Sequence, residues 1–571
     1  MIFDFDNLVY RDMKQYYRIG LFVLVLPVLL SCGKNAVEEG VVARNSTGQV
    51  AGTNSTNISY YAAARFAEQV SFGATPELIS EIQSKGMEAW IDEQFNLPLT
   101  TNQIPREYFT LPSSGQEKLI GEQRLGNVRS DDFWSTALTA KDQLRQRVAW
   151  AVFQYIPVAQ GQANGSLDYY NMLRRDVFTN YSSILKNVTI HPMMGFYLNN
   201  ELNRPSSPQC LGCAPNENYA RELLQLFTIG VVQLNKDGSV SRDANGKAKE
   251  SYSQKDVEEL ARALTGWKVA PNNTGLPDTY WPHYNQPMIP ETLAFLHDSG
   301  QKTVMGTVIK AGMKAPEELD AVVSMLMAHQ NIAPFVSLRL IQHLVMSNPS
   351  PQYISRVASV FRDNGSGKTG DMKAVIKAIL LDPEARKGDQ IGGDDSRTGY
   401  IREPVLWITS VYRGLGCTKM PRTVWQGLEI VEGVVNQDPV NVPSIFSFYQ
   451  ATDRAPGSNL LAPEQKLLNT QAFTDRLSNL SWRFVDKNNS MHTFNNEQTG
   501  CNFNELTAAF KKSPNEFVDL LSRKWFRGAM PATLRNSLVS LIRGENWEND
   551  LAGAVTSLQF AVTSPTFGVI K

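Results

Sequence analysis

The chain has few of the residues that enzymes most often use for acid–base and metal chemistry. Its 571 residues include six histidines and five cysteines. The sequence also lacks the HExxH, GxSxG, P-loop and glycine-rich dinucleotide motifs. These motifs are the signatures of zinc proteases, α/β-hydrolases, P-loop NTPases and Rossmann enzymes, so the sequence gives no support to any of these classes. A mechanism that depends on histidine therefore has few candidate residues.

An excess of either charge is absent as well. The 55 basic and 56 acidic residues give a net charge of −1 at pH 7, so electrostatics point to no nucleic acid and to no acidic polymer as a partner. Hydrophobic residues make up 42% of the chain, which is enough to bury a large core. The ten tryptophans suit such a core and are equally compatible with carbohydrate stacking.

The N-terminus has the pattern of an export signal. Lys14 and Arg18 precede an apolar run over residues 21–30, which is shorter than the roughly 20 residues that a membrane-spanning helix needs. The run leads into Leu-Leu-Ser-Cys-Gly at residues 29–33, which resembles a bacterial lipobox with Cys32 as the lipidated residue.

We therefore expect residues 1–32 to be a lipoprotein signal peptide, with Met13 as the true start of translation. An ordinary signal peptide that is cleaved nearby is the alternative. A lipid on Cys32 would anchor the protein to a bacterial membrane in the cell envelope, at the outer membrane or the cell surface. Residues 33–58 are small and polar, which suits a flexible tether.

Patterns typical of long strands are nearly absent from the rest of the chain, and no repeat of 20–50 residues is visible. The spacing of apolar residues instead predicts helices. The predicted helices span residues 61–69, 76–94, 131–155, 167–188, 316–327, 332–346, 351–361, 372–381, 404–415, 463–484, 503–510, 514–525, 531–541 and 546–563. Residues 96–127 have loop composition.

The predicted fold class is mainly α, a multi-helix globular domain with a minor β-hairpin insertion. The insertion is expected at residues 231–251, where Asn235 to Gly238 and Asn245-Gly246 are hairpin turn signals. The polar, glycine-rich stretch 387–399 divides a helical region at 59–390 from a second one at 391–571. We expect the two regions to pack as one unit.

Residues 216–267 contain two short helices that carry charges beside apolar faces. The first is predicted over 216–230, where Gly230 supplies the left-handed residue that ends it. The second is predicted over 254–267, with Ser253 and Asp256 as a capping box and Gly266 as its end. Such a pair is typical of the wall of a polar site.

These two segments resemble the signature of a bacterial family called domain of unknown function 1800. The resemblance covers residues 63–567. The other matching motifs are Arg65-Phe66 with residues 71–75, and residues 144–150, 297–303, 402–405 and 564–567. Many members carry histidine where this chain has Phe227, so a mechanism that needs histidine at that position is not expected here.

The resemblance implies a secreted or envelope protein without an established activity. Family members are often encoded beside a second secreted family, domain of unknown function 1501. The resemblance therefore implies a possible partner, which is a secreted protein of that second family.

The candidate site lies in and around the signature. The predicted catalytic residues are Glu217, Glu222, His297 and Asp298, and the predicted binding residues are Arg221, Arg262, Lys302 and His191. Paired carboxylates can divide the roles of general acid and base, and a histidine beside them can relay a proton or bind a metal. The sequence does not fix a metal or a cofactor.

We expect Arg221 and Glu222 to face one polar pocket together with Arg262 and the loop at 297–298. The reason is that charges beside a buried helix seam are costly unless they are paired. The alternative is a structural network of ion pairs, since Glu217 and Arg221 have the i, i+4 spacing that any helix can use.

The cysteines other than Cys32 are candidates for disulfides in an oxidising envelope. They are Cys210, Cys213, Cys417 and Cys501. Four cysteines allow three pairings, and a local bond between Cys210 and Cys213 is favoured. A thioredoxin-like site would need a βαβ unit, and a zinc site would need a second pair of ligands at suitable spacing.

Two hypotheses of function follow. The first is a hydrolase or modifying enzyme that acts on an extracellular polymer through the acidic and histidine residues. The second is a non-catalytic binding or scaffold lipoprotein that works with a secreted partner. A candidate cluster that is open to solvent would favour catalysis, and one that is fully paired and dry would favour a structural role.

Overall fold

The structure is a computed structural model, and it describes residues 58–101, 115–159, 163–206, 214–271, 286–395, 397–420, 422–425, 428–431, 437–484 and 499–571. Residues 54–571 form one compact unit. The predicted signal peptide, Cys32 and residues 33–57 of the tether lie outside the described residues, as do Cys210 and Cys213.

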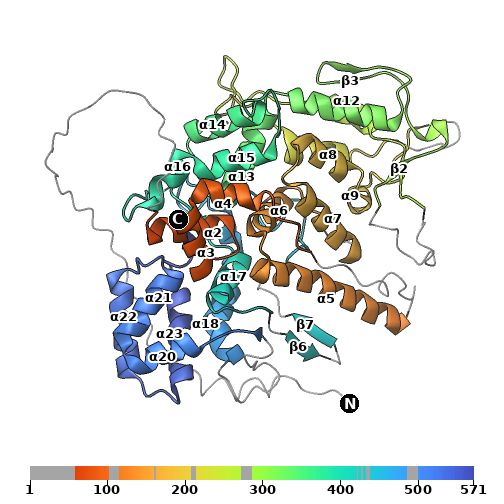
Figure 1. Cartoon of the computed structure of the whole chain (residues 1–571). Coiled ribbons are helices and arrows are strands. Elements are labelled where there is room, and N and C mark those ends of the chain that lie inside the picture. The colour runs from red at the N-terminus through yellow and green to blue at the C-terminus, as the bar shows by residue number, and fades with distance from the viewer. Residues whose placement is uncertain are drawn as a thin grey trace, which may run out of the picture. The chain divides into compact units, whose positions relative to one another are not determined.

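Helices dominate the described residues (Figure 1), which confirms the mainly α fold class. The helices are α2 (Tyr60–Val70), α3 (Pro76–Lys85), α4 (Met87–Gln94), α5 (Gly115–Thr139), α6 (Gln143–Tyr155), α7 (Ala163–Asp176), α8 (Tyr181–Thr189), α9 (Pro192–Tyr197), α10 (Asn218–Glu222), η2 (Leu223–Thr228), α11 (Gln254–Ala263), η3 (Ala294–Leu296), α12 (Ala315–Ala328), α13 (Ile332–Leu344), α14 (Pro351–Arg362), α15 (Met372–Leu381), α16 (Pro383–Arg386), η4 (Lys387–Asp389), α17 (Pro404–Gly414), η5 (Pro463–Leu467), α18 (Thr470–Phe484), α20 (Asn504–Lys512), α21 (Pro514–Trp525), α22 (Ala532–Gly544) and α23 (Asp550–Val562).

The strands are short and pair two by two in antiparallel fashion. They are β1 (Trp267–Lys268) with β2 (Ile289–Pro290), β3 (Lys302–Val304) with β4 (Thr307–Ile309), β5 (Tyr400–Ile401) with β8 (Val569–Ile570), and β6 (Arg422–Trp425) with β7 (Leu428–Val431). The expected hairpin insertion is present between η2 and α11, where antiparallel bridges join Val232 to Glu250, Leu234 to Val240 and Arg242 to Ala248.

The centre of the fold is built on α6 and α13. Every residue of α6 is buried, and α13 packs against α6, α14 and η2. Figure 1 shows both helices near the middle of the view, with α20 to α23 grouped at the lower left. Among the described residues, no single helix is long and apolar enough to cross a membrane. The helices α12 and α13 have the necessary length and composition only when they are taken together, and they are bent by 78° relative to each other.

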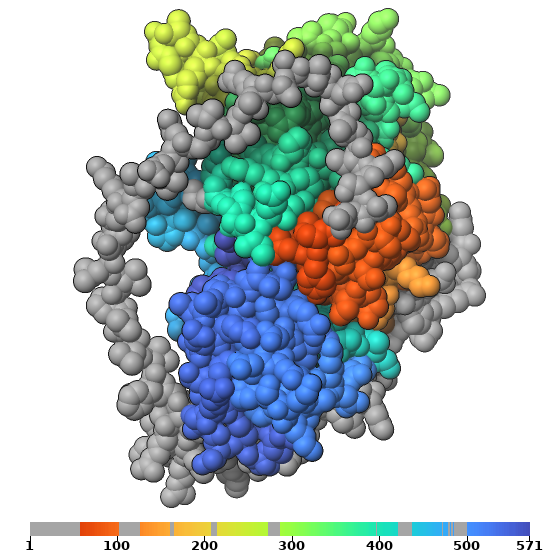
Figure 2. Space-filling view, turned by 60° about the vertical axis from the view of Figure 1, so that its left-hand side comes forward, coloured from red at the N-terminus to blue at the C-terminus, as the bar shows by residue number. Residues whose placement is uncertain are grey.

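The two ends of the compact unit meet. The strand β8 pairs with β5, and α2 contacts β8. Glu68 of α2 accepts hydrogen bonds from Arg402 at 2.9 Å and from Arg527 at 2.7 Å. Figure 2 shows the N-terminal segment, in red and orange, bordering the C-terminal helices in blue. These buried ion pairs tie the first helix to residues more than 300 positions away.

Two sequence predictions of local structure were wrong. The helix α5 begins at Gly115, inside the stretch that was expected to be a loop, because good helix formers such as Glu117 and Lys118 outweigh the glycines around them. The first signature helix is α-helical only over Asn218–Glu222 and continues as the π-helix η2.

Cys417 and Cys501 form a disulfide across a sequence separation of 84 residues. It joins the end of α17 to the segment that leads into α20. The favoured bond between Cys210 and Cys213 stays a prediction, since both residues lie outside the described part of the chain.

Candidate functional site

Six of the eight predicted site residues divide into two groups at opposite ends of α11. The first group lies at its start. Arg221 donates to Glu217 Oε2 at 2.7 Å and to Gln254 Oε1 at 3.0 Å, and Gln254 in turn donates to Glu217 Oε2 at 2.8 Å. About a third of the Glu217 side chain and 39% of the Arg221 side chain are exposed. This group is a solvated ion pair on the protein surface.

The second group lies at the end of α11 and is tightly paired. Arg262 binds both oxygens of Asp298, at 2.7 and 3.1 Å, and Glu259 at 2.9 Å. Lys302 donates to both oxygens of Glu318, at 2.5 and 2.7 Å, and to the backbone carbonyl of Asp298. The side chains of Lys302 and Glu318 are completely buried. Burial raises the pKa of Glu318 to about 7 against the opposing effect of Lys302.

His297 belongs to the second group. Its Nδ1 lies 2.9 Å from the backbone carbonyl of Thr265, which fixes the proton on Nδ1, and its Nε2 lies 3.7 Å from Glu318 Oε2. Burial lowers the pKa of His297, which favours the neutral form of the imidazole. Among the described residues, no three histidine, cysteine or acidic side chains are grouped to hold a metal ion.

The structure therefore does not place Arg221 and Glu222 in one pocket with Arg262 and the 297–298 loop. Gln254 and Arg262 stand eight residues apart on α11, which is about 12 Å along a helix axis. The charges at each end of the helix are paired locally instead of converging.

The two remaining candidates lie elsewhere. His191 caps α9: its Nδ1 accepts from Met193 N at 3.1 Å, and its Nε2 lies 3.2 Å from Asp168 Oδ2. Glu222 is half-buried, and its Oε2 has no hydrogen-bond partner among the described residues. Burial raises the pKa of Glu222, and the neighbouring Arg221 opposes that shift.

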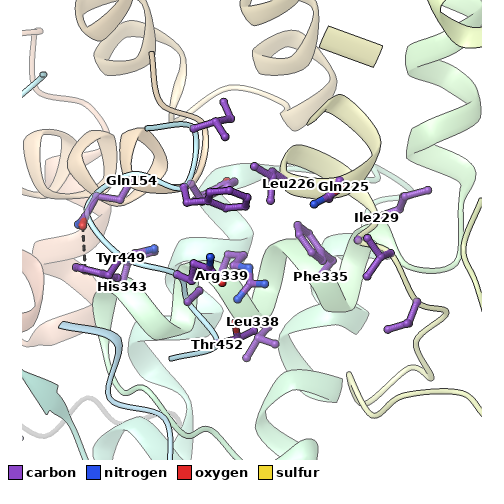
Figure 3. A pocket seen from close by; sticks show the side chains of 18 of the residues that line it. Gln154, Gln225, Leu226, Ile229, Phe335, Leu338, Arg339, His343, Tyr449 and Thr452 are labelled. Carbon is purple, nitrogen blue, oxygen red and sulfur yellow. Dashed lines mark hydrogen bonds between the residues drawn. The ribbon is translucent and has the colours of Figure 1, made fainter. Parts of the chain in front are cut away.

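A pocket of about 430 Å³ opens beside the π-helix, at a place where the sequence prediction put no site. We call it the η2–α13 pocket. Figure 3 shows Gln225, Leu226 and Ile229 on one side and Phe335 and Arg339 on the other. Its lining residues are Gln154, Tyr155, Gln225, Leu226, Ile229, Gly230, Val231, Val232, Leu234, Phe335, Leu338, Arg339, His343, Ile445, Phe446, Tyr449, Gln450, Ala451 and Thr452.

The π-helix explains how the signature lines this pocket. Ile229 N donates to Leu224 O at 3.0 Å, five residues back, and the Thr228 hydroxyl donates to Leu223 O. Asn331, just before α13, holds the end of this wide turn by donating to Ile229 O at 2.8 Å. Single π-turns inside helices are rare and occur frequently at functional sites.

A buried hydrogen-bond network supports the deep end of the pocket. Glu403 accepts from Trp150 Nε1 at 2.7 Å and from the Tyr449 hydroxyl at 3.1 Å. The same hydroxyl lies 2.9 Å from Gln154 Oε1, the contact that Figure 3 marks, and Gln437 donates to Glu403 at 2.8 Å. These bonds fix the orientation of Tyr449 and Gln154, both of which line the pocket.

Strongly perturbed groups surround this end of the pocket. Burial, with Arg147 and Arg339 nearby, lowers the pKa of His343 to about 3, so this imidazole is neutral. Burial also raises the pKa of Glu464 to about 8, and its Oε2 has no hydrogen-bond partner among the described residues. Groups of this kind gather at functional sites.

The sequence did contain a signal for this region. Trp150 and Glu403 belong to the motifs at 144–150 and 402–405, and Leu226 and Ile229 belong to the signature. Three motifs that are far apart in the chain thus meet at one place. The site residues predicted from the sequence were charged residues in and around the signature and did not include Trp150, Leu226 or Ile229.

The comparisons with known proteins agree with the resemblance seen in the sequence. The model of the family described as protein of unknown function (DUF1800) matches residues 65–569. This chain therefore belongs to that family. Neither the curated proteins nor the solved structures contain a match.

Proposed function

We propose that this protein is an exported, lipid-anchored envelope protein that binds an organic ligand in the η2–α13 pocket. The observation that carries the proposal is the pocket itself. Its walls are largely apolar, and a few polar side chains converge on it: Gln154, Gln225, Arg339, His343 and Tyr449. Its volume of about 430 Å³ lies in the range that small-molecule sites occupy.

Binding fits this geometry better than hydrolysis of a polymer. The catalytic residues predicted from the sequence do not share one cleft: Glu217 pairs with Arg221 at the protein surface, and Asp298 pairs with Arg262 at the other end of α11. Hydrolysis of a glycosidic bond ordinarily takes two carboxylic acids that face the bond. The described residues that line the η2–α13 pocket include neither aspartate nor glutamate.

A neutral, environment-sensitive dye tests the proposal. Nile red added to residues 54–571, which form a compact unit, should show saturable binding that Leu226→Trp abolishes, because the indole fills the space between η2 and α13. Leu293→Trp is the matched control, since Leu293 is 54% exposed and lies away from the pocket. Equal dye binding by all three proteins would refute the proposal.

A further inference from the structure

Arg339 is the one charged side chain among the described residues that line the η2–α13 pocket. It lies on α13, one turn after Phe335, and its guanidinium carbon stands 5.1 Å from the centre of that ring. Its Nη1 donates to Gln342 Oε1 at 2.9 Å. The stacking and the hydrogen bond hold the guanidinium in place at the pocket wall, where Figure 3 shows it.

This cation has no anionic partner in the part of the chain that the structure describes. Among the described residues, no aspartate or glutamate forms an ion pair with Arg339. Burial alone lowers the pKa of Arg339 to about 10. The charge of Arg339 in turn helps to lower the pKa of the neighbouring His343. Arg339 is half-buried, and a partly desolvated charge without a counter-charge is costly.

The surroundings select the kind of anion. His343 is neutral, so the described residues that line the pocket carry a single positive charge. One carboxylate would balance this charge, and a phosphate dianion would exceed it. Neutral amides of Gln154 and Gln225 and the Tyr449 hydroxyl supply further hydrogen-bonding groups. Leu226, Ile229 and Phe335 form an apolar wall that suits a hydrocarbon chain.

We propose that the ligand of the η2–α13 pocket is an amphiphilic carboxylate, an inference that rests on the proposed function. The carboxylate group would bind Arg339, and the hydrocarbon part would lie between η2 and α13. A guanidinium pairs with a carboxylate through two parallel hydrogen bonds, which adds direction to the attraction of the charges.

Photolabelling of the full chain in bacterial envelopes tests this assignment. The probes are dodecanoate and dodecan-1-ol, each with a diazirine in the chain, and mass spectrometry measures the labelling of peptides that line the pocket. Arg339→Gln should reduce labelling by the acid about tenfold and leave labelling by the alcohol unchanged, because a charge-assisted bond is lost while the apolar contact remains. Differences in membrane partition cancel when variants are compared with the same probe.

Three further variants make the test selective. Arg339→Lys keeps the charge and should retain most of the labelling by the acid. Arg356→Gln is the matched control, since Arg356 is 46% exposed on α14 and pairs with Asp382; it should change neither label. Leu226→Trp should abolish both labels.

The outcomes separate this inference from the proposed function. Labelling by the acid that survives Arg339→Gln would overturn the carboxylate assignment, while loss of both labels in Leu226→Trp would still support a ligand site. A diazirine-bearing dodecyl phosphate whose labelling falls by a larger factor on Arg339→Gln than that of the acid would also overturn the assignment. If Leu226→Trp leaves both labels unchanged, the pocket is not the ligand site and both proposals fail.

Discussion

Lys302 and Glu318 show what individual charged residues contribute to this protein. Both side chains are completely buried and bind each other through two hydrogen bonds. Lys302→Met would leave a buried carboxyl group without its partner, so we expect the free energy of unfolding to fall by about 3 kcal/mol. Arg221→Ala, which removes an exposed pair, should cost less than about 1 kcal/mol. Urea denaturation measures both, and equal effects would contradict the structural role of the Lys302 pair.

The raised pKa of Glu464 should make the stability of the protein depend on pH. Its pKa is raised by burial to about 8, above the ordinary value of about 4.3 that it has when the chain is unfolded. The folded state therefore holds this proton more tightly, and its contribution to stability is complete below about pH 4 and is lost as the pH rises toward 8. The free energy of unfolding of the wild-type protein should fall between pH 5 and pH 8. In Glu464→Gln we expect this fall to be smaller, by at most about 4 kcal/mol. Parallel pH profiles of the two proteins would show that Glu464 does not titrate in this way.

At the scale of elements, local signals in the sequence predicted the regular helices well. The helix α21 has the predicted bounds because Ser513 caps it, with its side chain accepting from Glu516 N, and Pro514 fits its first turn. The π-helix η2 was not predicted, since it depends on tertiary contacts such as the bond from Asn331 to Ile229. The pocket was missed for the same reason: Trp150 and Glu403 are 253 residues apart, and one sequence does not show that they pair.

The π-helix gives a test of how the signature shapes the pocket. Deleting Gln225 removes one residue from the wide turn, so the segment can close as an α-helix and the side chains on either side of the deletion change their relative direction by about 100°. We expect Nile red binding to be lost while the far-UV circular dichroism stays almost unchanged. Retained binding would mean that the π-helix is dispensable for the pocket.

The disulfide between Cys417 and Cys501 connects two helical elements, α17 and α20, across 84 residues. Cross-linking a loop of this length lowers the entropy of the unfolded chain by an amount worth about 4 kcal/mol. The double variant Cys417→Ser, Cys501→Ser should therefore unfold at lower urea concentration than the oxidised protein. A midpoint that does not change would show that the bond adds no stability.

At the scale of the whole molecule, the lipid anchor proposed at Cys32 would decide where the pocket works. If Cys32 carries the lipid, radiolabelled palmitate should enter the wild-type protein and should be absent from Cys32→Ala. Label that persists in Cys32→Ala would contradict the anchor. An anchored protein would hold an amphiphile-binding pocket near a membrane, which is a source of amphiphilic carboxylates.

The η2–α13 pocket must be the ligand site if the proposed function is right. The most direct measurement is a crystal structure of residues 54–571 grown with dodecanoate. We predict the hydrocarbon chain between Leu226 and Phe335, with a carboxylate oxygen about 3 Å from the guanidinium of Arg339. An empty pocket, or a dodecanoate bound only elsewhere on the protein, would contradict the account.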